Sequence, residues 1–119
     1  MTQPTRDEHP GFRLREAQRT LVVTFTGPKL PPDVGDPLYR LVEGGGHGRL
    51  VLNFENVRVL TSAPIGVLVN LKKKADAVQG GVRLCRIDPD LLEILRVTHT
   101  DRLFEIFDDE QDAIASFSP

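Results

Sequence analysis

The sequence predicts a single α/β domain with a mostly parallel sheet of four to five strands and about four helices. Short runs rich in Val, Leu, Ile and Phe alternate along the chain with segments whose apolar residues recur at helical spacing. The length of 119 residues is that of one ordinary domain. Residues 50–54 are almost continuously apolar, which predicts a central strand covered on both faces. We therefore expect one hydrophobic core.

The N-terminal part of the chain predicts a tail followed by an antiparallel pair of strands. Residues 1–11 are polar and show no period, so we expect a flexible tail there and the folded domain over residues 12–117. Phe12 and Leu14 alternate with arginines, which predicts a half-buried strand, and residues 21–26 predict the second strand. Three prolines in the next six residues then exclude helix and central strand, so a loop is expected.

Two helices are predicted on either side of the central strand. Asp36 followed by Pro37 predicts the cap and first turn of a short helix, which ends at the glycines of residues 44–46. The best helix in the sequence covers residues 62–79 and is ended by the glycines at 80–81. Its apolar face is expected to consist of Val67, Leu68, Leu71, Ala75 and Val78.

The C-terminal part predicts two further strands, each followed by a helix. Residues 82–87 alternate strictly and predict a strand, after which the Asp-Pro pair at 88–89 predicts the start of a helix reaching about residue 97. Residues 103–107 are β-like, and the acidic pair at 108–109 predicts the start of a last helix. Ala113, Ile114 and Phe117 are the residues expected to dock this helix on the sheet.

Composition limits the classes of partner and compartment. The net charge of −2 provides no basic footprint for nucleic acid, and no apolar run approaches the roughly 20 residues of a membrane span. The N-terminus lacks the apolar segment of a secretory signal, and Cys85 is the only cysteine. We therefore expect a cytoplasmic protein that binds other proteins and neither nucleic acid nor membrane. The oligomeric state is not predicted.

Glycine and histidine residues invite alternative sites that their positions argue against. The glycine-rich segment at 44–48 closes a helix and leads into a strand, whereas a phosphate loop follows a strand and opens a helix. We therefore expect a helix C-cap there. The histidines lie far apart without metal-site spacing, so neither a metal nor another cofactor is expected. These histidines are His9, His47 and His99.

A hydrolase is a further alternative, because Ser62, His99 and Asp101 supply the residue types of a catalytic triad. However, Ser62 lacks the Gly-x-Ser-x-Gly frame of a nucleophile elbow, and no oxyanion loop is evident. We therefore expect no catalytic residues and no enzymatic activity.

Ser62 is the most informative residue of the sequence. It precedes Pro64 by two residues, which places it at or next to the N-cap of the long helix, where a hydroxyl accepts a backbone hydrogen bond. A phosphate at the same position would carry a charge of roughly −1.5 to −2 beside the positive end of the helix dipole. Both a structural cap and a phosphorylation site therefore fit Ser62. The lysines at 72–74 share this helix, and they are either solvated or flank a partner surface.

The sequence resembles STAS domains, in particular anti-sigma-factor antagonists, over about residues 12–117. The resemblance rests on five stretches, namely residues 50–54, 57–60, 61–68, 79–84 and 92–107. In that family a strand leads to a short serine-containing segment that opens a helix. The resemblance implies that an anti-sigma factor, itself a serine kinase of the GHKL type, phosphorylates that serine. The unphosphorylated antagonist binds the kinase and frees the sigma factor, and phosphorylation releases the antagonist.

Ser62 matches the phosphoacceptor of the family, with Thr61 as the second choice. The family's hydrophobic-Gly pair after the serine falls on Ile65 and Gly66, and its frequent Leu-Phe pair falls on residues 103–104. The residues expected to bind the partner are Thr61, Ser62, Ala63, Pro64, Ile65, Gly66 and Lys73.

Three residues depart from the family pattern. Thr61 and Asn53 stand where Asp is usual, and Pro64 stands where Gly is usual. A second hypothesis is therefore a STAS module that works without phosphorylation, as a scaffold or as a subunit of a signalling or transport assembly.

Overall fold

A tight hairpin opens the fold of the computed structural model, which describes residues 11–44 and 46–117. Strands β1 (Phe12–Ala17) and β2 (Thr20–Phe25) pair antiparallel. Gln18 and Arg19 between them both have positive φ, at 53° and 65°, as the two central residues of a type I′ turn require. The predicted opening strand pair is confirmed, whereas the predicted tail lies almost entirely outside the described residues.

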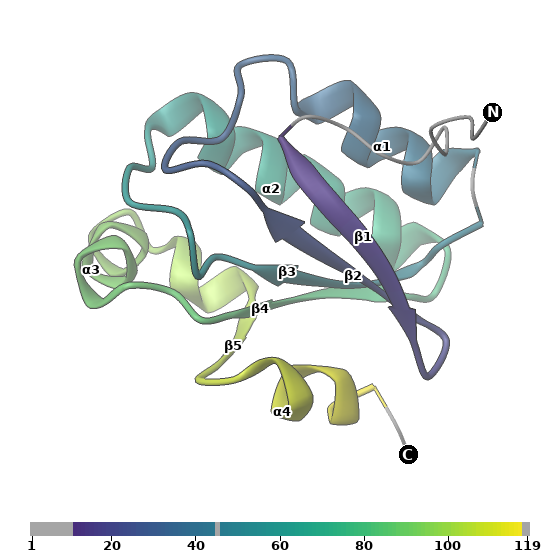
Figure 1. The fold of residues 1–119 in the computed structure, drawn as a ribbon. Coiled ribbons are helices and arrows are strands. Elements are labelled where there is room, and N and C mark those ends of the chain that lie inside the picture. Colours follow the sequence, from purple (N-terminus) through teal and green to yellow (C-terminus); the bar gives the residue numbers. More distant parts are fainter. Residues whose placement is uncertain (1–10, 45, 118–119) are drawn as a thin grey trace, which may run out of the picture.

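The remaining strands run parallel to β2, and all five form one sheet in the order β1-β2-β3-β4-β5. The strands are β3 (Arg49–Asn53), β4 (Gly81–Cys85) and β5 (Glu105–Phe107). The helices are α1 (Gly35–Glu43), α2 (Ser62–Ala77), α3 (Pro89–Val97), the 3₁₀ helix η1 (Thr100–Leu103) and α4 (Glu110–Ala115). Helices α1 and α2 lie on one face of the sheet and α4 on the other (Figure 1). The predicted α/β class with a mostly parallel sheet is confirmed.

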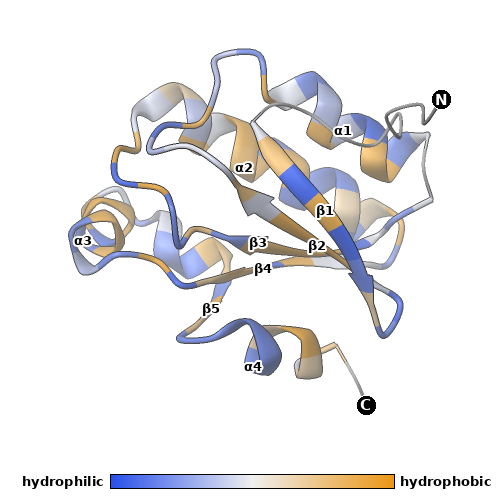
Figure 2. Ribbon diagram, in the orientation of Figure 1, coloured by the Kyte–Doolittle hydropathy of each residue, from blue (hydrophilic) through white to orange (hydrophobic). Residues whose placement is uncertain are grey.

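The sheet is buried on both faces, as the apolar run of β3 predicts. Leu50 and Leu52 point into the larger core, under α1, α2 and α3. Val51 points the other way, into a smaller core with Ala113 and Ile114 of α4. Strands β2, β3 and β4 are largely hydrophobic in Figure 2, in keeping with cover on both sides.

Three local predictions differ from the structure. The N-cap of α1 is Val34, whose carbonyl oxygen accepts from Leu38 N at 3.2 Å, so Asp36 lies inside the first turn instead of capping it. Helix α2 ends at Ala77, two residues earlier than predicted, and Val78, expected on its apolar face, is 54% exposed. Leu103 ends η1 and does not begin β5.

A glycine ends α1 as predicted, whereas α2 ends at Ala77 with Val78 as its C-cap and a left-handed Gln79 before Gly80. Gly44 caps α1, its N–H donating to Arg40 O at 2.9 Å, so the glycine-rich segment is a C-cap that leads into β3. Gly80 lies against Gly48, where a Cβ atom on Gly80 would come within 1.8 Å of the Gly48 oxygen. Only glycine fits that close approach between the two connections that lead into β3 and β4.

Candidate functional site at the start of helix α2

Helix α2 begins at the edge of the sheet where the parallel strands β2, β3 and β4 end. Residues 54–61 connect β3 to this helix, and Val57 and Leu60 within that connection are buried. These two anchors fix the segment against the core, so that the residues after Leu60 emerge at the surface. Loops at the carboxyl ends of parallel strands are the usual place for binding sites in open α/β sheets.

Backbone hydrogen bonds join this connection to the loop that follows β2. The amides of Arg58 and Val59 both donate to Pro28 O, at 2.7 and 2.9 Å. Lys29 and Val59 form an isolated parallel bridge. Asn56 Nδ2 adds a bond of 2.9 Å to the carbonyl oxygen of Phe25. The two loops therefore form one continuous surface beside the start of α2.

The hydroxyl of Ser62 is exposed and has no hydrogen-bond partner among the described residues. Thr61, and not Ser62, is the N-cap residue, with extended backbone at φ −101° and ψ 177°. Its side chain makes no capping bond, and only its carbonyl oxygen is used, accepting from Ile65 N at 3.3 Å. Ser62 is thus next to the N-cap, one of the two positions expected for it, and the structural alternative in which its hydroxyl caps the helix is not observed. Ser62 is the first residue of α2, and its hydroxyl is available for chemistry.

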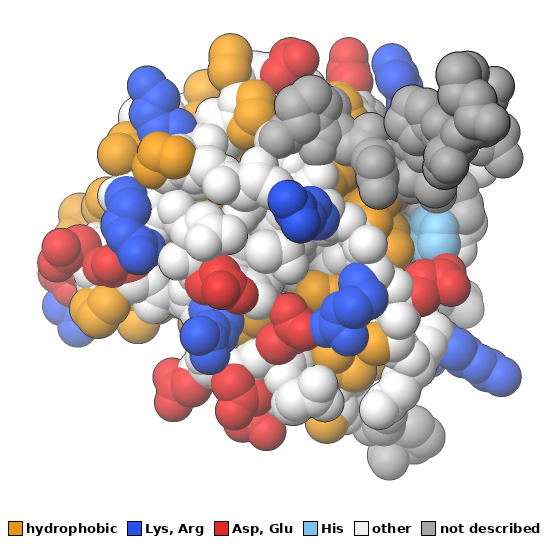
Figure 3. Space-filling view, in the orientation of Figure 1, with side chains coloured by type: hydrophobic (Ala, Val, Ile, Leu, Met, Phe, Trp, Pro, Cys, Tyr) orange, Lys and Arg blue, Asp and Glu red, His pale blue; other side chains and the backbone are white. Residues whose placement is uncertain are grey.

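The charge around the start of α2 favours an anion. The first turn contains no acidic residue, and the 16-residue helix directs the positive end of its dipole toward Ser62. Lys29 and Arg58 are both exposed on the joined loops. Elsewhere, on the face that Figure 3 shows, acidic and basic side chains are interspersed. The joined loops also carry the exposed acids Asp33 and Glu55, so it is the helix dipole, and not a net charge of the loops, that favours an anion at the start of α2.

Most of the residues predicted to bind a partner are exposed at this place. Thr61, Ser62, Ala63 and Gly66 are exposed, whereas Pro64 and Ile65 are half-buried. Ile65 packs against the larger core, which assigns part of its role to folding. A Cβ atom built on Gly66 would meet nothing within 4 Å, so no contact inside the described chain requires glycine at this position.

Lys73 lies on the same side of α2 as Gly66, seven residues or two helical turns further on. Its neighbours in the lysine run are engaged: Lys72 pairs with Asp76, and Lys74 pairs with Glu43 at 2.8 Å. The Glu43 hydrogen bond raises the pKa of Lys74. Within the described chain Lys73 alone of the three has no acidic partner, which leaves its charge available at the surface.

Sequence reasoning missed the contribution of the loop after β2. Lys29 and the 44% exposed Val59 join the surface around Ser62 only because the two loops are bonded together. No signal in the sequence predicts that Val59 is exposed, because the local pattern does not distinguish it from the buried Val57.

Asn53, one of the departures from the family pattern, is a structural residue. It is 2% exposed, and its Nδ2 atom donates to Glu110 Oε2 at 2.8 Å. Its Oδ1 atom accepts from Glu55 N at 2.9 Å. An amide can serve both partners, whereas an aspartate here would oppose the Glu110 carboxylate. The packing of α4 therefore explains why position 53 is an asparagine and not an aspartate, and the surface around Ser62 is not involved.

The alternative sites do not assemble in the described part of the chain. No hydrogen bond links Ser62, His99 and Asp101 there, and no three His, Cys, Asp or Glu side chains are grouped to hold a metal. Burial and the neighbouring Glu110 raise the pKa of the Cys85 thiol to about 12, which makes this cysteine unreactive. Among the described residues no helix is both long and apolar enough to cross a membrane.

Comparison with solved structures shows the same fold in several bacterial proteins. A candidate anti-sigma factor antagonist from Thermotoga maritima superposes with a TM-score of 0.83 at 17% identity, covering 91% of this chain and 95% of that one. An anti-sigma-factor antagonist (STAS) domain protein from Planctomyces limnophilus gives 0.81 at 21% identity, with 91% and 98% covered. SpoIIAA from Bacillus, a cell fate determinant solved in its phosphorylated form, gives 0.67 at 18% identity, with 88% and 97% covered.

The curated proteins contain no match to this chain. The family model of the STAS domain, however, matches residues 12–113, which is most of the chain and includes β1, the start of α2 and the first residues of α4. This chain therefore belongs to the STAS domain family.

Proposed function

We propose that this chain is an anti-sigma-factor antagonist, a cytoplasmic regulatory protein that binds other proteins and not an enzyme. In this proposal the surface around the start of α2 binds an anti-sigma factor that is also a serine kinase of the GHKL type. Phosphorylation of Ser62 then ends the binding. The observation that carries the proposal is the Ser62 hydroxyl, which is exposed, unbonded within the described chain and placed at the first position of a 16-residue helix.

The electrostatics of this surface support control by phosphate. A phosphate on Ser62 would add roughly −1.5 to −2 charges at the positive end of the helix dipole, where the fold tolerates negative charge. It would also add negative charge to the surface proposed to bind the partner, on which Lys29, Arg58 and Lys73 are exposed. A partner with an acidic contact surface would then lose its attraction and meet a like charge. The phosphorylated form of SpoIIAA, a protein of the same fold, is a precedent for such a modification.

The phosphorylation step is tested with the cognate kinase and ATP, followed by mass spectrometry. We expect one phosphate on Ser62 in the unaltered protein and none in the Ser62→Ala variant. The matched control is Thr61→Ala, which should still be phosphorylated because the neighbouring hydroxyl is intact. If neither Ser62 nor Thr61 is modified, the switch is refuted.

The binding step is tested separately by charge reversal at Lys29. Because Lys29 is exposed and bridged to Val59, the Lys29→Glu variant should fold normally and bind the anti-sigma factor about tenfold more weakly. The matched control is Arg19→Glu in the β1–β2 turn, at the opposite end of the parallel strand β2. If calorimetric titration gives equal affinities for the two variants, the loop after β2 is not part of the binding surface.

A second candidate function is a STAS module that binds its partner without phosphorylation, as a scaffold or as a subunit of a signalling or transport assembly. The observation in its favour is the absence of any acid in the first turn of α2, with Thr61 preceding the serine. A kinase that reads carboxylates there would not select this serine. In this second case Ser62→Asp leaves partner affinity unchanged, whereas the switch predicts a large loss.

A further inference from the structure

The sheet has two edges, and the edge formed by β1 is long enough to accept another strand. Strand β1 has six residues, whereas β5 at the other edge has three. A very short edge strand limits pairing with other chains, so β5 offers little to a partner. No described strand is paired with the outer side of β1 (Figure 1). The sheet can therefore be extended at β1.

The backbone of β1 directs alternate residues toward β2 and toward the free side. Gly11, just before the strand, accepts a hydrogen bond of 3.0 Å from the amide that follows β2. In an antiparallel pair the hydrogen-bonded positions recur every second residue, so Arg13 and Arg15 exchange their main-chain bonds with β2. The N–H and C=O groups of Leu14 and Glu16 consequently point away from β2, toward the open edge.

The two faces of this edge differ in their side chains. Leu14 is half-buried and packs against the larger core. Glu16 lies on the same face, with its Oε1 atom 3.8 Å from His47 Nδ1. Arg13 and Arg15 are exposed on the opposite face, where Arg15 pairs with the first residue of α4. One face of the edge is therefore basic, and the other is apolar beside Glu16.

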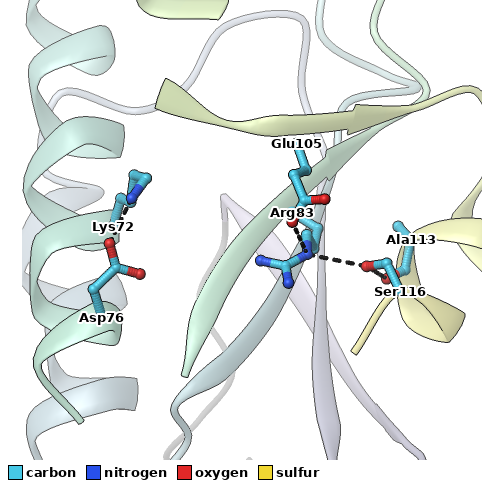
Figure 4. Close-up of polar contacts among 6 residues, drawn as sticks. All are labelled: Lys72, Asp76, Arg83, Glu105, Ala113 and Ser116. Atoms are coloured by element: carbon cyan, nitrogen blue, oxygen red, sulfur yellow. Dashed lines mark hydrogen bonds and ion pairs between the residues drawn. The ribbon is translucent and has the colours of Figure 1, made fainter. Parts of the chain in front are cut away.

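Arg13 differs from its neighbours on the α4 face because it has no partner. Arg15 is paired with α4, and Arg83 on β4 holds two groups. The Nε atom of Arg83 lies 3.0 Å from both Glu105 Oε2 and Ser116 Oγ, which flank it in Figure 4. Within the described residues the side chain of Arg13 makes no hydrogen bond and no ion pair. Its positive charge is therefore available at the β1 edge.

Like charges oppose the pairing of two copies of the chain through this edge. Directly opposite residues of an antiparallel pair lie on the same face of the sheet. If Leu14 of one copy faced Leu14 of the other, Arg13 of each copy would face Arg15 of the other. In the next two registers Arg15 would face Arg15, or Glu16 would face Glu16. Since like charges directly opposite each other are destabilising, a second copy is a poor partner for this edge.

We propose that the outer edge of β1 binds an extended segment of another protein in which acidic side chains alternate with apolar ones. The outward main-chain groups of Leu14 and Glu16 would bond to this segment, which would become a sixth strand of the sheet. Its acidic side chains would face Arg13 and Arg15, and its apolar side chains would lie beside Leu14 on the other face. The proposal rests on β1 and does not depend on the function proposed for Ser62.

The test uses the ¹⁵N-labelled chain and two short synthetic peptides, one alternating Glu with Val and one alternating Lys with Val. In the free chain the amides of Leu14 and Glu16 should exchange with deuterium quickly and those of Arg13 and Arg15 slowly, because only the latter bond to β2. The Glu-Val peptide should cause saturable NMR shifts along β1 and slow the two fast amides. The Lys-Val peptide should bind about tenfold more weakly. Shifts that do not saturate, or equal binding of both peptides, would overturn the proposal.

Two substitutions at Glu16 separate the main-chain bonds from the side chain. Glu16→Pro removes an N–H that points away from β2, so the β1–β2 ladder should remain and binding of the Glu-Val peptide should fall about tenfold. Glu16→Ala keeps this N–H and should bind the peptide at least as tightly as the unaltered chain. Thermal unfolding of both variants shows whether the sheet has formed. If both folded variants bind equally well, the edge is not the binding site.

The charge contribution and the competing occupant are tested in two further measurements. Arg13→Gln should weaken binding of the Glu-Val peptide about two- to fivefold, because an opposite-charge pair across the strands is lost. The matched control is Arg40→Gln, an exposed arginine of α1, which should leave the affinity unchanged. Analytical ultracentrifugation of the chain alone should show no dimer formed through β1. A dimer that Glu16→Pro abolishes would overturn the proposal in favour of pairing between two copies.

Discussion

The side-chain amide of Asn53 joins the end of β3 to α4 by donating a 2.8 Å hydrogen bond to Glu110 Oε2. The other oxygen of the same carboxylate pairs with Arg15 on β1, so Glu110 connects the first strand, the central strand and the last helix. Asn53 then accepts from Glu55 N at the beginning of the connection to Ser62. One buried amide thereby helps to set both the position of α4 and the path of the chain toward the candidate site.

Replacing this amide with the acid usual in the family should destabilise the fold. Asn53→Asp removes the donor and sets two carboxylates against each other in a buried place, which we expect to cost about 2–4 kcal/mol of unfolding free energy. Urea unfolding of the variant and the unaltered chain measures this difference.

The cause of that loss is checked in a second background. In a chain carrying Glu110→Gln the Asn53→Asp penalty should shrink, because the opposing charge is gone. Asn70→Asp, on an exposed position of α2, is the neutral control. A penalty of the same size with and without the Glu110 charge would show that repulsion is not its source.

Replacing Gly66 with alanine should raise the stability of the chain and weaken its binding to the partner. Because no atom lies within 4 Å of a Cβ built there, Gly66→Ala should stabilise the helix by about 0.5–1 kcal/mol. The added methyl group would nevertheless stand on the surface proposed to contact the anti-sigma factor, and affinity should fall. Thermal unfolding and calorimetric titration of the same variant measure the two quantities. A variant with raised stability and full affinity would place the contact elsewhere.

An acid at Ser62 should be favourable to the fold. The first turn of α2 has no acidic residue, so Ser62→Asp should raise the free energy of unfolding by roughly 0.3–1 kcal/mol at low salt. The same change at Asn70, in the middle of the helix, should lack this effect because the dipole acts only near the ends. Thermal melts at low and high salt separate the two variants. Destabilisation by Ser62→Asp would contradict the picture of an anion-tolerant helix start.

Cys85 should resist modification in the folded chain and weaken the fold at high pH. Its folded pKa is raised from 9.0 to about 12, so the folded state keeps the proton that the unfolded chain loses. This contribution to stability is complete below pH 9 and declines as the pH rises toward 12. A coloured disulfide reagent at pH 8 should therefore react slowly with the native protein and quickly in urea.

The alkaline effect has a direct control in Cys85→Ala. Between pH 9 and 11 the unaltered chain should lose more stability than this variant, since only the former has a thiol to ionise on unfolding. If urea unfolding shows that the unaltered chain and Cys85→Ala lose the same stability between pH 9 and 11, Cys85 does not contribute to the alkaline loss of stability.

The local signals in the sequence predicted nearly all of the secondary structure. Asp88 caps α3 by accepting from Asp90 N at 2.9 Å, as the Asp-Pro pair predicts. Asp109 caps α4 in the same way, accepting from Asp112 N at 2.8 Å. The errors fall at element ends, where α2 stops at Ala77 before its predicted end and η1 replaces the first part of a predicted strand. Adjacent residues with similar propensities compete for such positions, and contacts outside the segment decide between them.

The sequence by itself determined the order of strands and helices, the two-sided burial of β3 and the place of a serine at the start of α2. These follow from apolar periodicity and from Gly and Pro, whose effects act within a few residues. Only the tertiary structure decided that Asn53 faces Glu110 and that Lys29 lies beside Val59. Those outcomes depend on packing between segments far apart in the chain, and no local pattern encodes which polar group will find its partner there.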